Sequence, residues 1–403
     1  MIRPQALTSW WRVAAAVVAG FAVALNIGKV PAALPELRES LGIDLLWSGA
    51  IVSAFSVLAA LAGAVTGGFV QRFGAKRSAL AGLAAGAAGA CLGALTSALP
   101  LLLMARLIEG MGFIVAAVAL PSLIARSASA RDRPLALGIW GAFVPGGMGI
   151  MLFASPAVLA LGGWRASWLA AGATIAVCAA VLACAFAPGA PERAAASGQP
   201  GLRIYAGDPG ALRLAGCFAA YSAQFIALTS FLPTVLVAHH QISLAGAATM
   251  TATVVVANVA GNVGAGWLLR AGVSRRSLLS AAAAVMAFTA LATFAEPTPL
   301  ALRLAAAIAF AAVGGLIPGT LFAATSAYAR SASGVAVLAG MLLQGSGLGQ
   351  VAGPVVLAGI VQHFGQWHYA ALLMIGASAV IIYLAWSLPD PRTPARTRAD
   401  SQR

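Results

Sequence analysis

Long apolar stretches alternate with short polar segments along the whole chain. About 20 apolar residues in a helix cross the hydrocarbon core of a bilayer, and windows of that length occur twelve times. The windows are Val13–Leu34, Leu46–Val70, Ser78–Leu99, Leu101–Ile124, Leu135–Leu161, Ala166–Ala187, Leu214–Ala238, Ala245–Leu269, Leu278–Ala295, Leu304–Tyr328, Val335–Val361 and Trp367–Leu388. Lipid offers the backbone no hydrogen-bonding partners, and these segments are too long for barrel strands. The pattern therefore predicts an all-α membrane protein with twelve transmembrane helices.

The first apolar stretch also has features of a signal peptide, because Arg3 and Arg12 precede it. A signal peptide is followed by a soluble mature chain, whereas eleven further spans follow here. Without the first span the two halves of the chain would also be unequal. We therefore interpret it as a transmembrane helix.

Composition narrows the class of protein further. Hydrophobic residues make up 61% of the chain and charged residues only 8%, against roughly 25% charged in a soluble domain. This excludes a soluble globule, a disordered chain and a nucleic-acid-binding domain, despite a net charge of +14. The four cysteines lie in apolar runs, and the four histidines, of which His239 and His240 are placed in an outer loop, lack metal-site spacing. With no phosphate-binding loop or catalytic constellation, we expect no enzyme, no metal and no cofactor.

Basic residues define an orientation, because cytoplasmic loops of membrane proteins are enriched in Lys and Arg. With both termini in the cytoplasm, nineteen of the 24 basic residues fall inside and three fall outside, namely Arg38, Arg165 and Arg303. Glu36, Glu39 and Asp44 gather in the first outer loop. The sequence predicts a multi-pass protein of a bacterial-type inner membrane with cytoplasmic termini.

The least hydrophobic internal stretch divides the chain near its middle. Pro188–Gly210 is rich in Pro, Gly and Ser and has the composition of a cytoplasmic linker. We therefore expect a six-helix bundle at 1–187, a linker at 188–210, and a second six-helix bundle with a short basic tail at 211–403.

The two halves carry the same loop pattern. Gly67–Arg77 follows the second span and Gly266–Arg276 follows the eighth, and both have the order glycine, basic, glycine, basic–basic. Small-xxx-small glycine series also occur at Gly63–Gly67, Gly82–Gly86 and Gly345–Gly353, and such faces let helices approach closely. Parallel six-span repeats are one arrangement of transporter halves.

The first-half loop resembles the signature G-x-x-x-D-R-x-G-[RK]-[RK] of the major facilitator superfamily, a likeness that extends over essentially the whole chain. Residues assigned to this gating motif are Gly67, Gln71, Arg72, Gly74, Lys76 and Arg77. The resemblance implies two pseudo-symmetric six-helix bundles that open alternately. Gln71 stands where the family usually has an Asp that helps hold the halves together by charge, so this contact is uncharged here.

Two further segments carry the resemblance. Arg106–Gly112 in the fourth span is similar to the family signature R-x-x-x-G-x-G. Within the family, LGIWGAFVPGGMG, TSFLPTVL and LLQGSGLGQVAGP look most like the cyanate and nitroimidazole transporters. The fifth span is similar to the antiporter signature, although Val144 stands where that signature has Gly.

Ionisable residues inside spans are costly in a bilayer and mark functional sites. Lys29 lies in the first span, and Arg106 and Glu109 lie in the fourth, both of which line the central cavity in the facilitator fold. One interpretation is an anion site in which a cation is left to meet a carboxylate-like solute. The other is an ion pair that orders the helices, with Arg106 reaching toward the outer surface. Glu109 is also the best candidate for the proton-coupling residue, because it is the only carboxylate in any span.

Uncharged polar residues complete the candidate substrate site. Most lie three or four residues from another member or from a cation and so share a helix face with it, whereas Gln344 stands alone in the eleventh span. The full candidate set is Asn26, Lys29, Arg106, Tyr221, Gln224, Asn258, Asn262 and Gln344. Hydrogen bonding between helices is the alternative role for the uncharged members.

The sequence therefore predicts a monomeric secondary transporter that moves a small anionic solute by alternating access. It would use a proton or ion gradient and bind no nucleic acid. The alternative is proton-coupled efflux of neutral or lipophilic drugs. Cationic drugs are disfavoured, because the spans hold one carboxylate and aromatic residues make up 7% of the chain.

Overall fold

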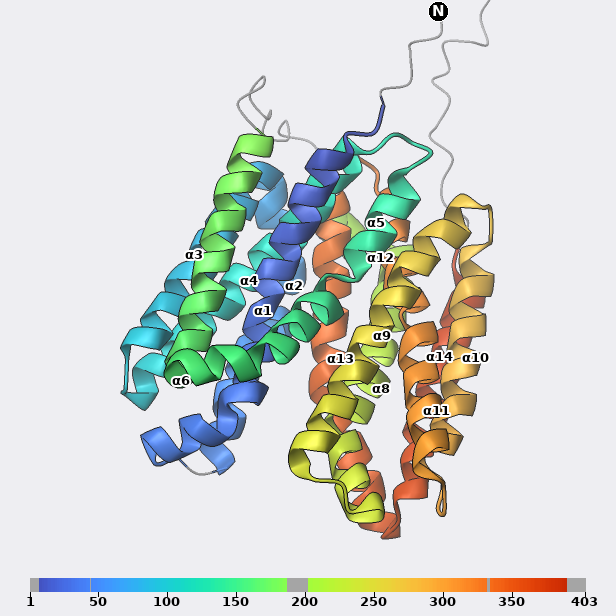
Figure 1. The fold of residues 1–403 in the computed structure, drawn as a ribbon. Helices are drawn as coiled ribbons and strands as arrows, with labels where there is room; N and C mark the ends of the chain where they lie inside the picture. Colours follow the sequence, from blue (N-terminus) through green and yellow to red (C-terminus); the bar gives the residue numbers. More distant parts are fainter. Residues whose placement is uncertain (1–6, 44, 187–201, 332–333, 390–403) are drawn as a thin grey trace, which may run out of the picture.

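A computed structural model describes residues 7–43, 45–186, 202–331 and 334–389, and its regular elements in these ranges are helices (Figure 1). The helices are α1 (Trp10–Leu41), α2 (Leu45–Phe73), α3 (Ala75–Leu95), α4 (Leu99–Ser127), α5 (Arg133–Gly141), α6 (Phe143–Ala185), α7 (Leu202–Ala206), α8 (Pro209–His240), α9 (Leu244–Arg270), α10 (Arg275–Phe294), α11 (Leu300–Gly314), α12 (Leu316–Tyr328), α13 (Gly334–Phe364), η1 (Trp367–Ala370) and α14 (Ala371–Ser387).

In the described residues, eleven helical segments are long and apolar enough to cross a membrane. One of them, α6, has 43 residues and bends at Gly162 and Gly163, where Gly163 has φ 65°. Figure 1 shows α6 turning back at this bend. The bend falls between the predicted fifth and sixth spans, and the count of twelve stays a prediction. Apolar side chains such as Leu95 (82% exposed) and Phe288 (75% exposed) cover the outside of the bundle, as lipid contact requires.

The helices form two groups that lie side by side (Figure 1). In the first group, α1 to α6, the most extensive packing is of α1 on α6 and α3 on α4. In the second group, α8 to α14, α13 packs on α8 and α10 on α14. The groups meet mainly where α2 packs on α13 and α5 on α9. The domain limits placed at 187 and 211 stay predictions.

The two copies of the loop pattern adopt the same backbone turn. Gly74 separates α2 from α3 with φ 91°, and Gly272 separates α9 from α10 with φ 93°. Side chains rarely tolerate such positive φ, which explains why both copies have glycine there. The sequence echo therefore reflects one local structure used twice.

Glycines also set the spacing between helices. A Cβ on Gly349 of α13 would lie 2.1 Å from the Ala219 carbonyl oxygen on α8, and one on Gly63 would lie 2.6 Å from the Gly340 carbonyl oxygen. Backbones this close leave no room for a side chain. The packing role expected of the small-xxx-small series holds at these contacts.

We call the two ends of the molecule the basic end and the opposite end. The basic end carries Arg12, Arg72, Arg133, Arg270 and Arg275, near the start of α1 and the junctions of α2 with α3, α4 with α5, and α9 with α10. The opposite end carries the end of α8, the turn between α10 and α11, and the bend of α6.

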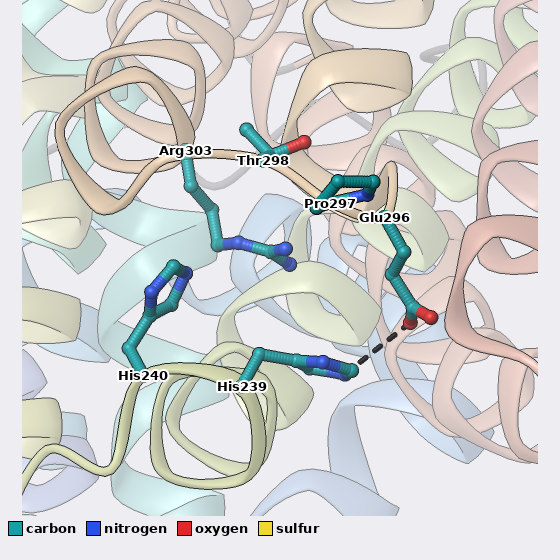
Figure 2. A pocket seen from close by; sticks show the side chains of 6 residues that line it. All are labelled: His239, His240, Glu296, Pro297, Thr298 and Arg303. Carbon is teal, nitrogen blue, oxygen red and sulfur yellow. Dashed lines mark ion pairs between the residues drawn. The ribbon is translucent and has the colours of Figure 1, made fainter.

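Two of three sequence-based boundaries are corrected by the structure, and the third, the linker, is described only in part. Glu36 and Glu39, expected in a loop, extend α1 to Leu41, because nothing in VPAALPELRESL stops the helix once its prolines are accommodated. The predicted linker 188–210 is helical at Leu202–Ala206 and from Pro209, where Asp208 caps α8; its residues 188–201 and the basic tail from 390 lie outside the described residues. His239 and His240, expected in a loop, form the last turn of α8 and line a pocket (Figure 2).

Candidate functional site

Three charged side chains lie buried together between α1 and α4. Lys29 Nζ donates to Glu109 Oε1 at 2.7 Å and to Asn26 Oδ1 at 2.6 Å. Arg106 donates to the other carboxylate oxygen of Glu109. Lys29 and Glu109 are 0% exposed and Arg106 is 2% exposed. We call Lys29, Arg106 and Glu109 the charged triad; two cations and one carboxylate give it a formal charge of +1.

Aromatic rings and backbone carbonyls complete the surroundings of the two cations. Lys29 Nζ lies 4.5 Å from the ring centroid of Trp168 on α6, and the Arg106 guanidinium lies 4.7 Å from that of Phe55 on α2. Arg106 also donates from Nε to the Ile51 carbonyl at 3.2 Å and from Nη1 to the Asn26 carbonyl at 3.1 Å. Cation–π contacts of this kind are strongest where water is absent.

The local sequence makes room for this triad. Arg106 and Glu109 are three residues apart on α4 and therefore share a face. On α3, a Cβ at Gly89 would lie 2.9 Å from Glu109 Cγ, and one at Gly93 would lie 2.5 Å from Trp168. In the described part of the chain, the hydrogen-bond and ring partners of the triad belong to the first group of helices. The triad is thus enclosed by that group, rather than open to a cavity between the groups as the resemblance implied.

A second polar cluster, without formal charge, lies in the second group. Asn258 Nδ2 donates to the Tyr221 hydroxyl at 2.9 Å and to the Ala311 carbonyl at 2.7 Å. Asn262 Nδ2 donates to Asn258 Oδ1 at 2.9 Å and to the Asn258 carbonyl at 3.0 Å. We call Tyr221, Asn258 and Asn262 the amide network. It joins α8, α9 and α11, and Asn262 Oδ1 faces Gly141 of α5, where a Cβ would lie only 2.3 Å away.

The two predicted glutamines behave differently. Gln224 bonds within the second group, where its Oε1 accepts from Ser378 Oγ at 3.3 Å, and its buried Nε2 has no partner. Gln344 bonds across the groups, because its Oε1 accepts from the Ala64 backbone N–H on α2 at 3.2 Å. Only Gln344 of this pair bridges the two groups by a hydrogen bond of its side chain in the described residues.

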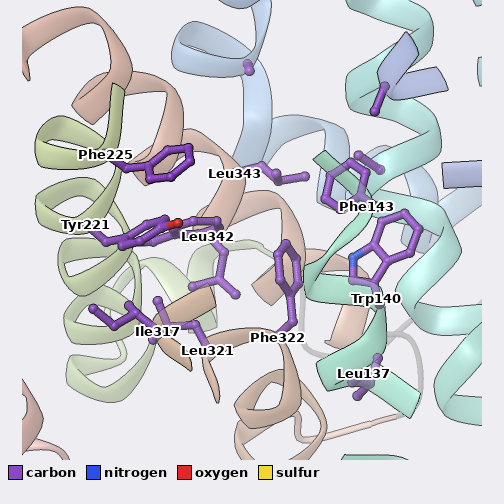
Figure 3. Packing of buried hydrophobic residues seen from close by; sticks show 14 of the residues in the cluster. Leu137, Trp140, Phe143, Tyr221, Phe225, Ile317, Leu321, Phe322, Leu342 and Leu343 are labelled. Carbon is purple, nitrogen blue, oxygen red and sulfur yellow. The ribbon is translucent and has the colours of Figure 1, made fainter. Parts of the chain in front are cut away.

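An aromatic row connects the charged triad with the amide network. Its members are Phe55, Phe113, Phe143, Trp140, Phe322, Phe218, Tyr221 and Phe225, with neighbouring ring centroids 4.3–6.3 Å apart. Figure 3 shows Trp140 and Phe143 of the first group facing Phe322, with Tyr221 and Phe225 beyond it. The row starts beside Arg106, at Phe55, and ends on α8. The sequence alone does not predict this row, because ring contacts between distant spans leave no signal in one sequence.

The gating motif lies at the basic end, where the groups touch. A Cβ on Gly67 would lie 2.7 Å from Val337 Cα on α13, and the Arg72 guanidinium lies 5.6 Å from the Phe73 ring. Gln71 is buried, 9% exposed, and Gly74 forms the turn into α3, whose first residues include Lys76 and Arg77. The motif is therefore packed against the second group where α2 meets α13.

An ion pair that sequence reasoning missed joins the groups at the same end. Asp132, between α4 and α5, lies 3.0 Å from Arg270 Nη2 at the end of α9. The Thr8 hydroxyl donates to Asp132 at 2.7 Å and, together with Arg270, holds the pKa of this carboxyl below its usual value. Arg270 occupies, in the second copy of the motif, the place of Arg72. That correspondence was the available signal, but it did not identify the carboxylate partner.

Comparison with known proteins settles the family. The sequence model of the Major Facilitator Superfamily matches residues 16–342 and again 214–403. This chain belongs to the major facilitator superfamily. It is accordingly a multi-pass membrane transporter and not an enzyme. A comparison with curated protein sequences finds no match.

Solved structures of superfamily transporters share the fold. The human organic anion transporter MFSD10 (TETRAN) superposes with a TM-score of 0.73 at 17% identity, covering 94% of this chain and 99% of that one. The E. coli fucose:proton symporter FucP has a TM-score of 0.75 at 16% identity, covering 94% and 98%. The proton:xylose symporter XylE has a TM-score of 0.75 at 14% identity, covering 94% and 96%. At these identities the likeness concerns the fold, and the branch of the superfamily stays a prediction.

Proposed function

We propose that this transporter moves a small organic anion across an inner membrane by alternating access, driven by a proton or ion gradient. The observation that carries the proposal is the charge of +1 on the triad, buried where water cannot balance it. An ionisable group in the bilayer core costs several kcal/mol on insertion scales. A carboxylate solute would neutralise the excess charge.

A spare hydrogen-bond donor supports the same conclusion. Lys29 has only donors to offer, so Asn26 must present its oxygen to Lys29 and keeps its NH₂ for another partner. Asn26 Nδ2 is buried without one. A free donor beside a net positive charge favours an acceptor that carries negative charge. Asn26 and Lys29 are therefore the residues proposed to meet the solute first, with Arg106 held by Glu109.

The row of aromatic rings gives the route between this charge and the contact of the two groups. Phe55 covers the Arg106 guanidinium on the side of the row. Movement of that ring, as the groups rock apart, would open the triad to a solute between them. The amide network and Gln344 would then offer neutral polar contacts on the other side.

Glu109 is the proposed proton carrier. In the described structure its two oxygens accept from Lys29 and Arg106. When a solute anion takes over Lys29, one oxygen of Glu109 loses its positive partner and becomes available to a proton. Solute binding and proton binding are thereby coupled at one carboxylate.

The orientation proposed places the basic end in the cytoplasm, because basic residues concentrate there. Asp132 with Arg270, and Gly67 with Val337, hold the groups together at that end. The described structure would then be closed toward the cytoplasm. We propose a monomer as the working unit, since both helix groups of one chain contribute to the site.

A charge series at the triad tests the proposal. Lys29→Gln leaves the Arg106–Glu109 pair with no net charge, whereas the double variant Lys29→Gln/Glu109→Gln returns the charge to +1 on Arg106. The readout is the increase in Tm caused by each compound of a panel of small carboxylates, cyanate, nitrate, nitroimidazoles and lipophilic drugs. A ligand at about 100 times its Kd adds about 2.7 kcal/mol of stability.

The expected result is a Tm increase by a carboxylate in the wild type, its loss in Lys29→Gln, and its partial return in the double variant. Glu39→Gln, on the exposed end of α1, is the matched control and should behave as the wild type. If a carboxylate raises the Tm equally in the wild type, Lys29→Gln and the double variant, the triad only orders helices. In reconstituted vesicles, the double variant should also lose the pH dependence of uptake.

Efflux of neutral or lipophilic compounds is the second candidate, favoured by the aromatic row. Rings such as Phe143, Phe322 and Phe225 offer large apolar surfaces at the contact between the groups. In the same panel, lipophilic compounds would then raise the Tm of wild type and Lys29→Gln equally, and small carboxylates would have no effect.

A further inference from the structure

A polar pocket lies at the opposite end of the second helix group. It is far from the charged triad in the chain and belongs to a different group of helices. It has a volume of about 300 Å³ and is lined by His239, His240, Glu296, Pro297, Thr298 and Arg303. Pockets that bind small molecules start at about this size. The two histidines come from the last turn of α8, Glu296 to Thr298 from the turn after α10, and Arg303 from α11.

Arg303 is buried, 1% exposed, although it carries a full charge. Its Nη1 donates to the Thr293 carbonyl at 2.9 Å and its Nη2 to the Ala295 carbonyl at 3.0 Å. Its Nε has no hydrogen-bond partner, and in the described residues no carboxylate lies within ion-pair distance of the guanidinium. Buried guanidinium groups are ordinarily paired with an anion, because an uncompensated charge is costly.

The carboxylate of the pocket is already engaged. Glu296 Oε1 lies 3.2 Å from His239 Nε2, and its charge acts on Arg303 only from beyond ion-pair distance. His240 has a buried Nε2 without a partner. Figure 2 shows the Arg303 guanidinium pointing into the space between His240, His239 and Glu296. The unused groups of the pocket, an Arg303 N–H and an imidazole nitrogen, are both suited to one anionic acceptor.

We propose that this pocket binds a small carboxylate between Arg303 and His240. A guanidinium has five N–H donors, and two of those of Arg303 are used, which leaves enough to hold a planar carboxylate. Thr298 and Pro297 form the wall beyond it. The site is separate from the triad and does not depend on the function proposed there.

His240 gives the pocket a pH dependence. A proton taken up there adds one positive charge beside Arg303, so carboxylate binding should strengthen as pH falls and weaken again when the ligand itself becomes protonated.

Histidine NMR on the full-length protein in detergent provides a local readout, because the chain has only four histidines. Acetate is the probe, titrated at about pH 6, and resonances are assigned with His239→Gln and His240→Gln. We expect saturable movement of the His239 and His240 signals, with His363 and His368 unmoved. Arg303→Lys, which keeps the charge but not the fork, and His240→Gln should each weaken binding about tenfold, as expected for one charge-assisted hydrogen bond.

His363→Gln is the control and should leave the movement of the His239 and His240 signals on acetate addition unchanged. If Arg303→Lys does not fold, His240→Gln alone carries the test, because it leaves the guanidinium and its carbonyl contacts in place. The proposal is overturned if the two signals do not move, if Arg303→Lys and His240→Gln bind acetate as the wild type does, or if chloride or inorganic phosphate binds at least as tightly as acetate.

Discussion

The charged triad and the amide network occupy opposite groups of helices and solve the burial of polar atoms in different ways. In the triad, one carboxylate accepts hydrogen bonds from two cations, and the buried polar atom beside it that lacks a partner is a donor, Asn26 Nδ2. In the network, neutral amides and a hydroxyl bond one another, and the atom left over is an acceptor, Asn262 Oδ1. Donor and acceptor cannot be exchanged by turning the amides, because Lys29 offers only donors and the Asn258 carbonyl only accepts.

This difference indicates how the two groups divide the work of transport. The triad holds an excess charge in a rigid, fully buried frame, which is suited to recognising an anion. The network lies against Gly141 of the facing group, so its spare acceptor sits at a contact that, in the proposed mechanism, separates when the groups rock. Under that proposal, charge recognition and the moving contact would lie on different groups, connected by the aromatic row.

Removing the carboxylate of the triad should have the largest effect on stability. Glu109→Gln leaves Lys29 and Arg106 buried side by side without an anion, and breaking a buried pair in this way costs about 3–5 kcal/mol. We expect a large fall in Tm in detergent. Lys29→Gln alone should cost much less, because the Arg106–Glu109 pair remains. Equal losses in Glu109→Gln and in the exposed control Glu39→Gln would contradict a charge-balancing role for Glu109.

Disrupting the amide network should lower the stability less, because no buried charge loses its partner. Asn258→Leu removes the side-chain bonds to the Tyr221 hydroxyl, the Ala311 carbonyl and Asn262, with an expected cost of about 1–3 kcal/mol. Asn258→Asp keeps the acceptor but loses the two donated bonds, to Tyr221 and Ala311. The measurement is the Tm of both variants. Thr253→Val, at an exposed position on α9, is the control for effects of substitution on the helix itself. A loss in Asn258→Leu as large as in Glu109→Gln would remove the distinction between the two clusters.

The sequence was sufficient for the fold because hydrophobic periodicity and the loop motif are local signals. The paired turns at Gly74 and Gly272 could be located from the repeated glycines, and the spans from their length. The meeting of Lys29, Arg106 and Glu109 was also expected, since these are rare charges in lipid and two share one helix. Local rules failed at the ends of elements: α1 runs past its prolines, and the two histidines of α8 belong to its last turn.

The partners across helices could not be predicted, because one sequence contains no record of which spans touch. Trp140 and Phe322 are 182 residues apart in the chain yet their rings lie 6.3 Å apart. Contacts between residues distant in the sequence also enclose the triad with Phe55 and Trp168 and form the pocket around Arg303. The spare atoms on Asn26 and Asn262 became visible only when each hydrogen-bond partner had a position.

The smallest expected effect concerns the contact between the groups at the basic end. Asp132→Asn removes the charge that faces Arg270 at 3.0 Å but keeps a group that can accept from Thr8. An ion pair this close to solvent is screened, so the closed arrangement should be weakened only a few-fold. The readout is the labelling rate of a cysteine placed at buried Val337, in a variant without the four native cysteines, by a membrane-impermeant maleimide.

Because Thr8 and Arg270 lower the pKa of Asp132 below its ordinary value of 3.8, the carboxylate stays ionised and its contribution persists above that value. That contribution is lost only as pH falls through the lowered pKa, so the ratio of labelling rates between variant and wild type should be constant from about pH 5 to pH 8. If this ratio changes between about pH 5 and pH 8, the pH sensitivity of closure comes from Asp132 and not from the triad.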